Sequence, residues 1–128
     1  MAAGGVPGWW RDAEVHLGQV MDGFAPRPQQ AELVALMDAA AGSRSHAAVE
    51  APTGSGKSIA ALMVAERFGG RAVISTATRA LQEQYRTVDV PRLRDAGLLT
   101  KTVVVLEGRG RFVCRARRRS STVRSRAR

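Results

Sequence analysis

The sequence lacks the features of disulfide-bonded, membrane-spanning and secreted proteins. Cys114 is the single cysteine among 128 residues, so no disulfide can form within the chain, and a reducing cytoplasm is the simplest compartment. No apolar run reaches the roughly 18 residues of a membrane span. Residues 1–8 have no Lys or Arg and no apolar stretch, so they do not resemble a signal peptide.

Acidic residues are absent after Glu107, and this absence accounts for the net charge of +9. Residues 1–108 hold 11 Lys and Arg against 11 Asp and Glu, whereas residues 109–128 hold nine Arg and no acid. The excess charge therefore belongs to one segment and not to a domain surface, which weakens a general case for nucleic-acid binding. Residues 115–128 contain only Arg, Ser, Ala, Thr and Val, and we expect them to be disordered.

The spacing of apolar residues predicts helices and strands in alternation. Helices are expected at residues 9–21, 28–41, 57–68 and 80–86, and short apolar strands at residues 47–51, 72–76 and 102–106. This order favours an α/β fold, with a parallel sheet flanked by helices. The expected domains are an N-terminal amphipathic helix in residues 1–23, one α/β domain in residues 24–114, and the disordered Arg-rich tail in residues 115–128.

The strongest chemical motif is Ala-Pro-Thr-Gly-Ser-Gly-Lys-Ser at residues 51–58. Gly54 and Gly56 allow backbone N–H groups to turn toward phosphate oxygens at the start of a helix. Lys57 can reach the β- and γ-phosphates of a nucleotide, and the Ser58 hydroxyl can bind Mg²⁺.

A chance Gly-Ser-Gly-Lys turn is the alternative reading of this loop, and Ala51 stands where the usual pattern has Gly. A predicted strand before the loop and a predicted helix after it favour the phosphate-binding interpretation. The residues expected to bind ATP here are Thr53, Gly54, Ser55, Gly56, Lys57 and Ser58, and we expect Lys57 and Ser58 to take part in catalysis.

Five segments, in this order, resemble superfamily 2 helicases of the DinG/XPD type. Arg27-Pro-Gln-Gln resembles the adenine-recognition motif, and residues 51–58 resemble motif I, which often begins with Ala in that family. Residues 75–85 resemble motif Ia, and residues 89–93 fit the segment after it. Residues 106–114 resemble the approach to the first iron–sulfur cysteine.

The resemblance covers roughly residues 20–115 and implies part of a RecA-like P-loop NTPase domain from an ATP-dependent 5′-to-3′ DNA helicase. It implies that Gln30 hydrogen-bonds the adenine, flanked by Arg27, and that single-stranded DNA is a partner. A solvent-facing residue in a first helical turn is the alternative for Gln30. The resemblance places Thr76, Thr78 and Gln82 near DNA, whereas strand-end and helix-cap roles are the alternative for the two threonines.

The resemblance also implies a [4Fe–4S] cluster at Cys114, but four thiolates are needed and this chain has one, so the cluster cannot be completed here. The Asp-Glu-Ala-His motif that the family uses for hydrolysis is absent as well. We therefore expect a truncated or frameshifted gene product that does not hydrolyse ATP alone. A genuine short protein with a nucleic-acid-binding arm is the alternative.

Three functions remain open from the sequence. The first is the ATP-binding portion of a DNA helicase, with no membrane and no small-molecule substrate other than ATP. The second is nonspecific nucleic-acid binding through the Arg-rich tail. The third is another P-loop ATPase such as a kinase, which the segments at residues 27–30 and 75–85 argue against.

Overall fold

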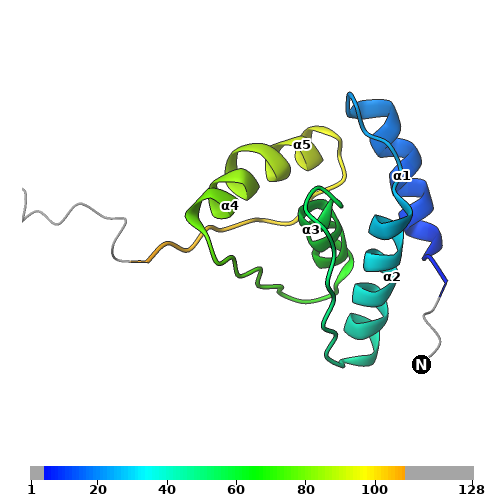
Figure 1. Ribbon diagram of the computed structural model, residues 1–128. Coiled ribbons are helices and arrows are strands. Elements are labelled where there is room, and N and C mark those ends of the chain that lie inside the picture. The colour runs from blue at the N-terminus through cyan, green and yellow to red at the C-terminus, as the bar shows by residue number, and fades with distance from the viewer. Residues whose placement is uncertain (1–4, 109–128) are drawn as a thin grey trace, which may run out of the picture.

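The structure is a computed structural model that describes residues 5–108. The expected iron–sulfur position, Cys114, and the Arg-rich segment 115–128 lie outside these residues. The elements in chain order are α1 (Gly8–Val20), α2 (Pro28–Ser43), α3 (Lys57–Arg67), α4 (Arg79–Gln84), the π-helix η1 (Tyr85–Asp89) and α5 (Val90–Asp95). Figure 1 shows α1, α2 and α3 side by side, with the continuous run from α4 to α5 on the other side of α3.

The four predicted helices are confirmed, with ends that shift by a few residues. Pro28 occupies the first turn of α2, where its missing N–H leaves no hydrogen bond unmade. This helix continues past Gly42 to Ser43, and Arg44 then turns into the left-handed region with φ of 53°. The Ser45 N–H donates to the Ala40 carbonyl at 2.9 Å, which closes the helix end in the manner of a Schellman motif.

The predicted helix at residues 80–86 is the beginning of a longer helical run that the sequence did not predict. Pro91 favours a break in a regular helix, because it lacks an N–H and its ring clashes with the carbonyl four residues earlier. Here the wider π-turn of η1 precedes Pro91, and the chain continues as α5 to Asp95. The widened turn also contacts α3.

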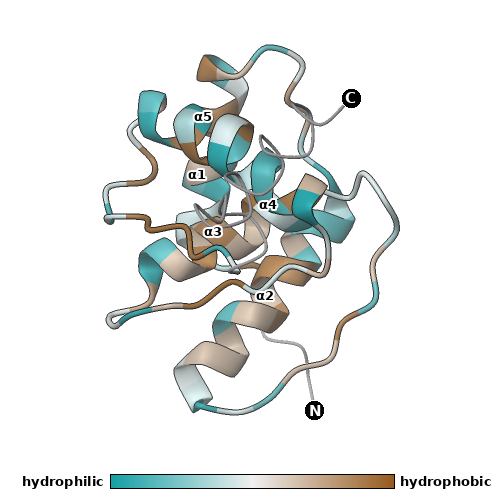
Figure 2. Cartoon of the chain, turned by 90° about the vertical axis from the view of Figure 1, so that its left-hand side faces the viewer, coloured by the Kyte–Doolittle hydropathy of each residue, from teal (hydrophilic) through white to brown (hydrophobic). Residues whose placement is uncertain are grey.

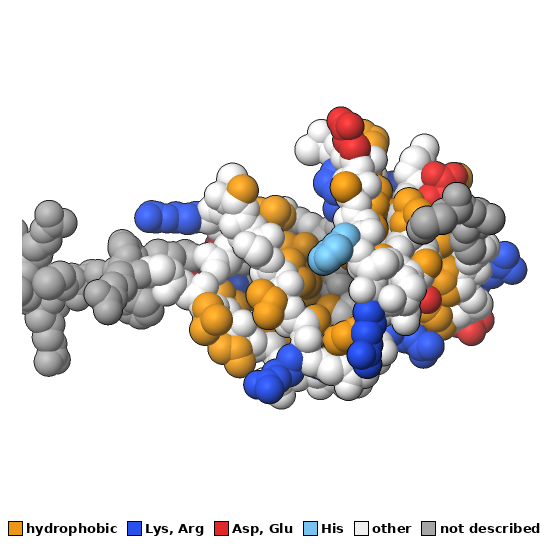
Figure 3. All heavy atoms as spheres, turned by 90° about the horizontal axis from the view of Figure 1, so that it is seen from below, with side chains coloured by type: hydrophobic (Ala, Val, Ile, Leu, Met, Phe, Trp, Pro, Cys, Tyr) orange, Lys and Arg blue, Asp and Glu red, His pale blue; other side chains and the backbone are white. Residues whose placement is uncertain are grey.

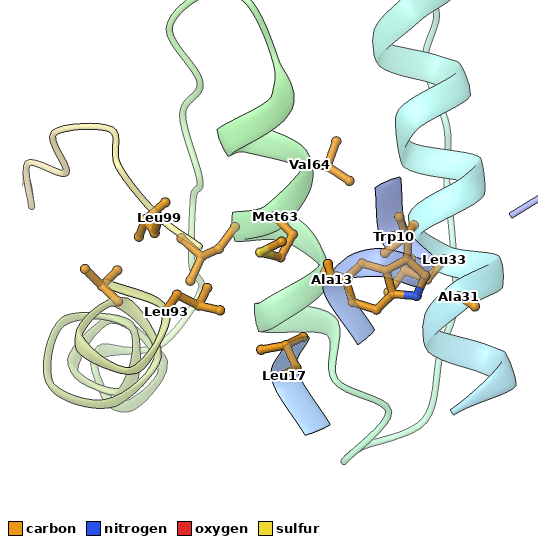
Figure 4. Packing of buried hydrophobic residues seen from close by; sticks show 13 residues of the cluster. Trp10, Ala13, Leu17, Ala31, Leu33, Met63, Val64, Leu93 and Leu99 are labelled. Atoms are coloured by element: carbon orange, nitrogen blue, oxygen red, sulfur yellow. The ribbon is translucent and has the colours of Figure 1, made fainter. Parts of the chain in front are cut away.

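One apolar core joins the helices. It contains Trp10 and Leu17 of α1, which are fully buried, together with Ala13 of the same helix. Figure 4 shows these residues facing α2 and α3, with Trp10 beside Leu33. The remaining buried members are Ala31, Leu33, Val34, Ala60, Leu62, Met63, Val64, Val90, Leu93 and Leu99. The N-terminal helix thus shares its core with the rest of the described chain.

The three segments predicted as strands carry no regular secondary structure within residues 5–108. They run as extended chain, and apolar stretches mark them in Figure 2. Most of their side chains are open to solvent, with Val73 91%, Val104 73% and Leu106 84% exposed. Apolar side chains also gather on the face seen in Figure 3.

A strand is stabilised by hydrogen bonds to a neighbouring strand, and a single extended segment lacks them. Residues 101–108 nevertheless alternate between half-buried and exposed positions, which is the two-residue period of a strand. The parallel sheet therefore stays a prediction, and of the three segments only residues 101–108 have the side-chain alternation of a strand.

Glu66 and Lys101 attach one of these extended segments to the C-terminal end of α3. The Glu66 carboxylate accepts the Thr100 hydroxyl at 2.5 Å and the backbone N–H groups of Thr100 and Lys101, both at 3.2 Å. The Lys101 ammonium donates to the carbonyls of Ala65, at 2.8 Å, and of Phe68. A cation at this end of a helix interacts favourably with the helix dipole.

This network predicts a loss of stability in acid. Burial raises the pKa of Glu66, but the hydrogen bonds from Thr100 and Lys101 and the Lys101 charge outweigh it, so the pKa lies below its ordinary value of 4.5. Because the folded pKa is depressed, the contribution is complete above pH 4.5 and is lost as pH falls through the folded pKa.

We expect the urea midpoint of the Glu66→Gln variant to lie below that of the parent at pH 7 and to approach it in acid. The Glu50→Gln variant, with an exposed carboxyl, is the control. An equal difference between Glu66→Gln and parent at pH 7 and pH 3 would contradict the linkage.

None of the helices in the part of the chain that the structure describes is long and apolar enough to cross a membrane.

Candidate nucleotide-binding site

The loop at residues 51–58 turns sharply through two glycines before α3 begins. Gly54 has φ of 81° and Gly56 has φ of 82°, both in the left-handed region that favours glycine. Gly56 is the N-cap residue of α3, and its carbonyl accepts the Ala60 N–H at 3.0 Å. The first N–H groups of α3 have no partner within the helix, so the loop leads into a helix end suited to an anion.

Gln30 packs directly against this loop. Its side chain is 1% exposed, and its Nε2 donates to the Gly56 carbonyl at 3.0 Å. A Cβ atom at residue 56 would lie 2.2 Å from Gln30 Nε2, so the close approach of the two residues requires glycine. The solvent-facing alternative for Gln30 is therefore wrong, whereas contact with adenine stays a prediction.

Arg27, one helical turn before Gln30, contacts the same loop. Its Nη1 donates to the Gly54 carbonyl at 2.7 Å. Two residues expected to surround the adenine thus hold the carbonyls of the two left-handed glycines, and the structure brings the segment at 27–30 and the loop at 51–58 into one site.

Lys57 curls back over the loop. Its ammonium donates to the carbonyls of Ala51, at 2.7 Å, and Pro52, at 2.6 Å. The side chain is exposed, so phosphate oxygens can replace these carbonyls as acceptors. Lysine suits this exchange, because its ammonium is a point charge on a flexible stem.

Two buried polar atoms beside the loop have no hydrogen-bond partner among the described residues. They are the Ser55 hydroxyl, in a residue that is 6% exposed, and the Gln30 Oε1 atom. Buried polar atoms in native proteins are nearly always paired, and an unpaired one is destabilising. A polar ligand in the loop is one way to satisfy them.

Ser58, the expected Mg²⁺ ligand, lies in the first turn of α3 and is half-buried. Its side chain lies near the Tyr85 hydroxyl. Burial raises the pKa of Tyr85, the nearby Ser58 hydroxyl opposes this shift, and the charge of Asp89 adds to it. Sequence reasoning missed Tyr85, because no motif relates it to Ser58 and only the folding of η1 onto α3 brings them together.

The residues expected near DNA lie apart from the loop contacts described above. The Thr78 hydroxyl accepts the Leu81 N–H at 3.3 Å as the N-cap of α4, and the Thr76 hydroxyl donates to the Thr78 carbonyl at 3.3 Å. Gln82 donates to the Leu106 carbonyl at 2.8 Å. The cap role weighed for Thr78 is present, and DNA contact by all three residues stays a prediction.

Between residues 5 and 108, no group of three or more His, Cys, Asp or Glu side chains could hold a metal ion.

Sequence comparison places this site among known proteins. The ATP-dependent DNA helicase YoaA of Haemophilus influenzae is 36% identical over 98 residues, which is 77% of this chain and 15% of that protein. The ATP-dependent DNA helicase DinG of Escherichia coli is 37% identical over 97 residues, 71% of this chain and 13% of that protein. The 3′-5′ exonuclease DinG of Bacillus subtilis is 31% identical over 113 residues, 85% of this chain and 12% of that protein.

No protein family model and no solved structure matches the chain. The chain spans between 12% and 15% of the length of these relatives. The resemblance expected from the motifs is thus confirmed over most of the chain, which is a homologue of the DinG and YoaA ATP-dependent DNA helicases and corresponds to a short part of their length.

Proposed function

We propose that this chain binds Mg²⁺ and ATP through the loop at residues 51–58, as part of the ATP-binding lobe of a DinG-like DNA helicase. The observation that carries the proposal is the joined site: Arg27 and Gln30 contact the carbonyls of Gly54 and Gly56, next to the exposed Lys57 ammonium. Packing of residues 27–30 against Gly54 and Gly56 favours the helicase type of P-loop over a P-loop of unrelated function. The names of the relatives support ATP as the nucleotide.

Several residues have the chemistry that the bound nucleotide needs. Lys57 would exchange its loop carbonyls for phosphate oxygens, and the N–H groups at the start of α3 would donate to the same phosphates. Ser55 offers a buried hydroxyl without a partner among the described residues. The Ser58 hydroxyl would hold Mg²⁺, which would balance the negative charge of the phosphates.

Hydrolysis requires more than this grip on the phosphates. A positioned water and a second acidic anchor for Mg²⁺ are common to P-loop ATPases. The residues described here offer phosphate-binding groups, so we propose binding without appreciable turnover by this chain on its own. The relatives' names support DNA as the partner. We propose Thr76, Thr78 and Gln82 as its contacts. We also propose a preference for single-stranded DNA and, for the whole helicase, 5′-to-3′ polarity.

Binding of a fluorescent ATP analogue in the presence of Mg²⁺ tests the proposal on the full chain. Replacing Lys57 with alanine should weaken binding by about tenfold to a hundredfold, because it removes a charge-assisted contact to phosphate.

The Arg71→Ala variant is the matched control, because it removes an exposed cation outside the loop and should leave the affinity unchanged. If the parent chain shows no binding, or if Lys57→Ala binds as tightly as the parent, the proposed function is wrong.

A further inference from the structure

The hydrogen bond from Arg27 to the phosphate-binding loop fixes the direction of a whole peptide unit. Arg27 Nη1 donates to the Gly54 carbonyl at 2.7 Å. Among the residues that the structure describes no peptide bond is cis, and in a trans unit the C=O and the following N–H point in opposite directions. By holding the Gly54 carbonyl, Arg27 therefore turns the Ser55 N–H away from itself.

The Ser55 N–H is available to an anion. It donates to the Pro52 carbonyl at 3.3 Å, which is longer than the usual limit of about 3.2 Å, so a phosphate oxygen can replace this weak acceptor. Gly54 and Gly56, on either side of it, both have left-handed φ values. Backbone N–H groups in turns of this kind form concave sites for anions.

The two glycine turns of the loop differ in what holds them. A Cβ atom at Gly56 would meet the Gln30 side chain, so packing restricts this turn. At Gly54 a Cβ atom would meet nothing within 4 Å, and the backbone of glycine has many conformations open to it. The Arg27 hydrogen bond restrains this open turn from outside the loop.

Arg27 itself extends from a rigid part of the backbone. Pro26 and Pro28 flank it, and a residue before proline is restricted to extended conformations. Arg27 has φ of −125° and ψ of 123°, and its carbonyl accepts the N–H groups of Gln30, at 2.9 Å, and Ala31, at 3.1 Å, where α2 begins. Because this backbone is already fixed, less conformational entropy is lost when the guanidinium holds the loop.

We propose that Arg27 is a positioning residue for the phosphate-binding loop, holding the Gly54 carbonyl so that the Ser55 N–H faces the phosphates of a bound nucleotide. This inference rests on the proposed nucleotide site. It differs from the role that the sequence resemblance implies, in which Arg27 flanks the adenine. A flanking residue acts on the base, whereas a residue that shapes the loop acts on phosphate binding even when no base is present.

The test measures how strongly ATP and inorganic tripolyphosphate displace a fluorescent ATP analogue from the full chain with Mg²⁺ present. We expect Arg27→Ala to weaken the binding of both competitors by the same factor, about three- to tenfold, the size of one hydrogen bond. Arg71→Ala removes another exposed cation and should leave both affinities at the parent value. A loss for ATP alone would assign Arg27 to the base and overturn the inference.

A second measurement distinguishes positioning from direct contact between Arg27 and the phosphates, which would also weaken both competitors. Hydrogen exchange of the Ser55 amide is followed by NMR in the absence of any ligand. We expect faster exchange in Arg27→Ala than in the parent, because the peptide unit loses its anchor and the weak bond to Pro52 opens more often. Unchanged exchange would indicate direct contact and would overturn the inference.

The outcomes separate this inference from the function on which it rests. A parent chain that binds neither ATP nor tripolyphosphate overturns both. A parent chain that binds both compounds, with an Arg27→Ala variant of equal affinity, overturns only the role of Arg27.

Discussion

Replacing Gly56 with alanine should destabilise the fold and remove nucleotide binding, whereas the same change at Gly54 should be much milder. Both glycines have a positive φ, which an alanine adopts at a cost of about 1–2 kcal/mol. At Gly56 the new methyl carbon would also meet Gln30 Nε2 at 2.2 Å, while at Gly54 it meets nothing within 4 Å.

Relieving such a clash requires Gln30 or the loop to move, and overpacking of this kind adds about 1–3 kcal/mol. The free energy of unfolding should therefore fall by about 2–5 kcal/mol for Gly56→Ala, measured by urea denaturation. Nucleotide binding should be lost even where the protein remains folded, because the loop cannot keep its turn.

Combining Gly56→Ala with Gln30→Ala isolates the clash from the backbone strain. The truncated side chain leaves room for the methyl group, so the double variant should be more stable than the sum of the two single effects predicts. If Gly56→Ala and Gly54→Ala lose equal stability, the packing of Gln30 against the loop is not as the structure describes.

The second large effect is expected at Trp10. This side chain is fully buried and stands at the junction of α1, α2 and α3. Replacing it with alanine leaves a cavity among all three helices and should lower the free energy of unfolding by about 3–5 kcal/mol. A small domain has only about 5–15 kcal/mol in total, so the thermal transition should broaden or disappear.

Val15→Ala is the matched control for Trp10. Val15 is on the same helix, but its side chain is 63% exposed, and we expect a change within about 0.5 kcal/mol. The comparison also tests whether α1 belongs to the core. If Trp10→Ala is as mild as Val15→Ala, α1 does not contribute to the core in the way that the structure describes.

Local signals were sufficient for much of the helical structure. The predicted helices at residues 28–41 and 57–68 correspond to α2 and α3, and Pro28 at the start of α2 and the glycines after α3 each act on the backbone of their own turn. The run from Tyr85 to Asp95 was missed beyond residue 86. Pro91 is a local signal for a break, whereas the structure has a π-turn before it that contacts α3.

Some residues of the candidate site were identified from the sequence, whereas their contacts were seen only in the structure. Gly54, Gly56, Lys57 and Ser58 were identified from the sequence, since the chemistry of phosphate binding acts within one short loop. The resemblance singled out Gln30 and Arg27, but their hydrogen bonds to the loop carbonyls were not predicted. Tyr85 carried no signal at all.

The sequence by itself determined which segment grips a phosphate, where most helices begin and end, and to which proteins the chain is related. These properties depend on residues that are close together in the chain. Only the tertiary structure decided that Gln30 is buried against Gly56, which residues of α2 and α3 share the core with α1, and that Tyr85 lies near Ser58. Each joins segments far apart in sequence, so it depends on how the helices pack. The sheet predicted for residues 47–51, 72–76 and 102–106 requires such long-range pairing as well, because a strand is stable only beside another.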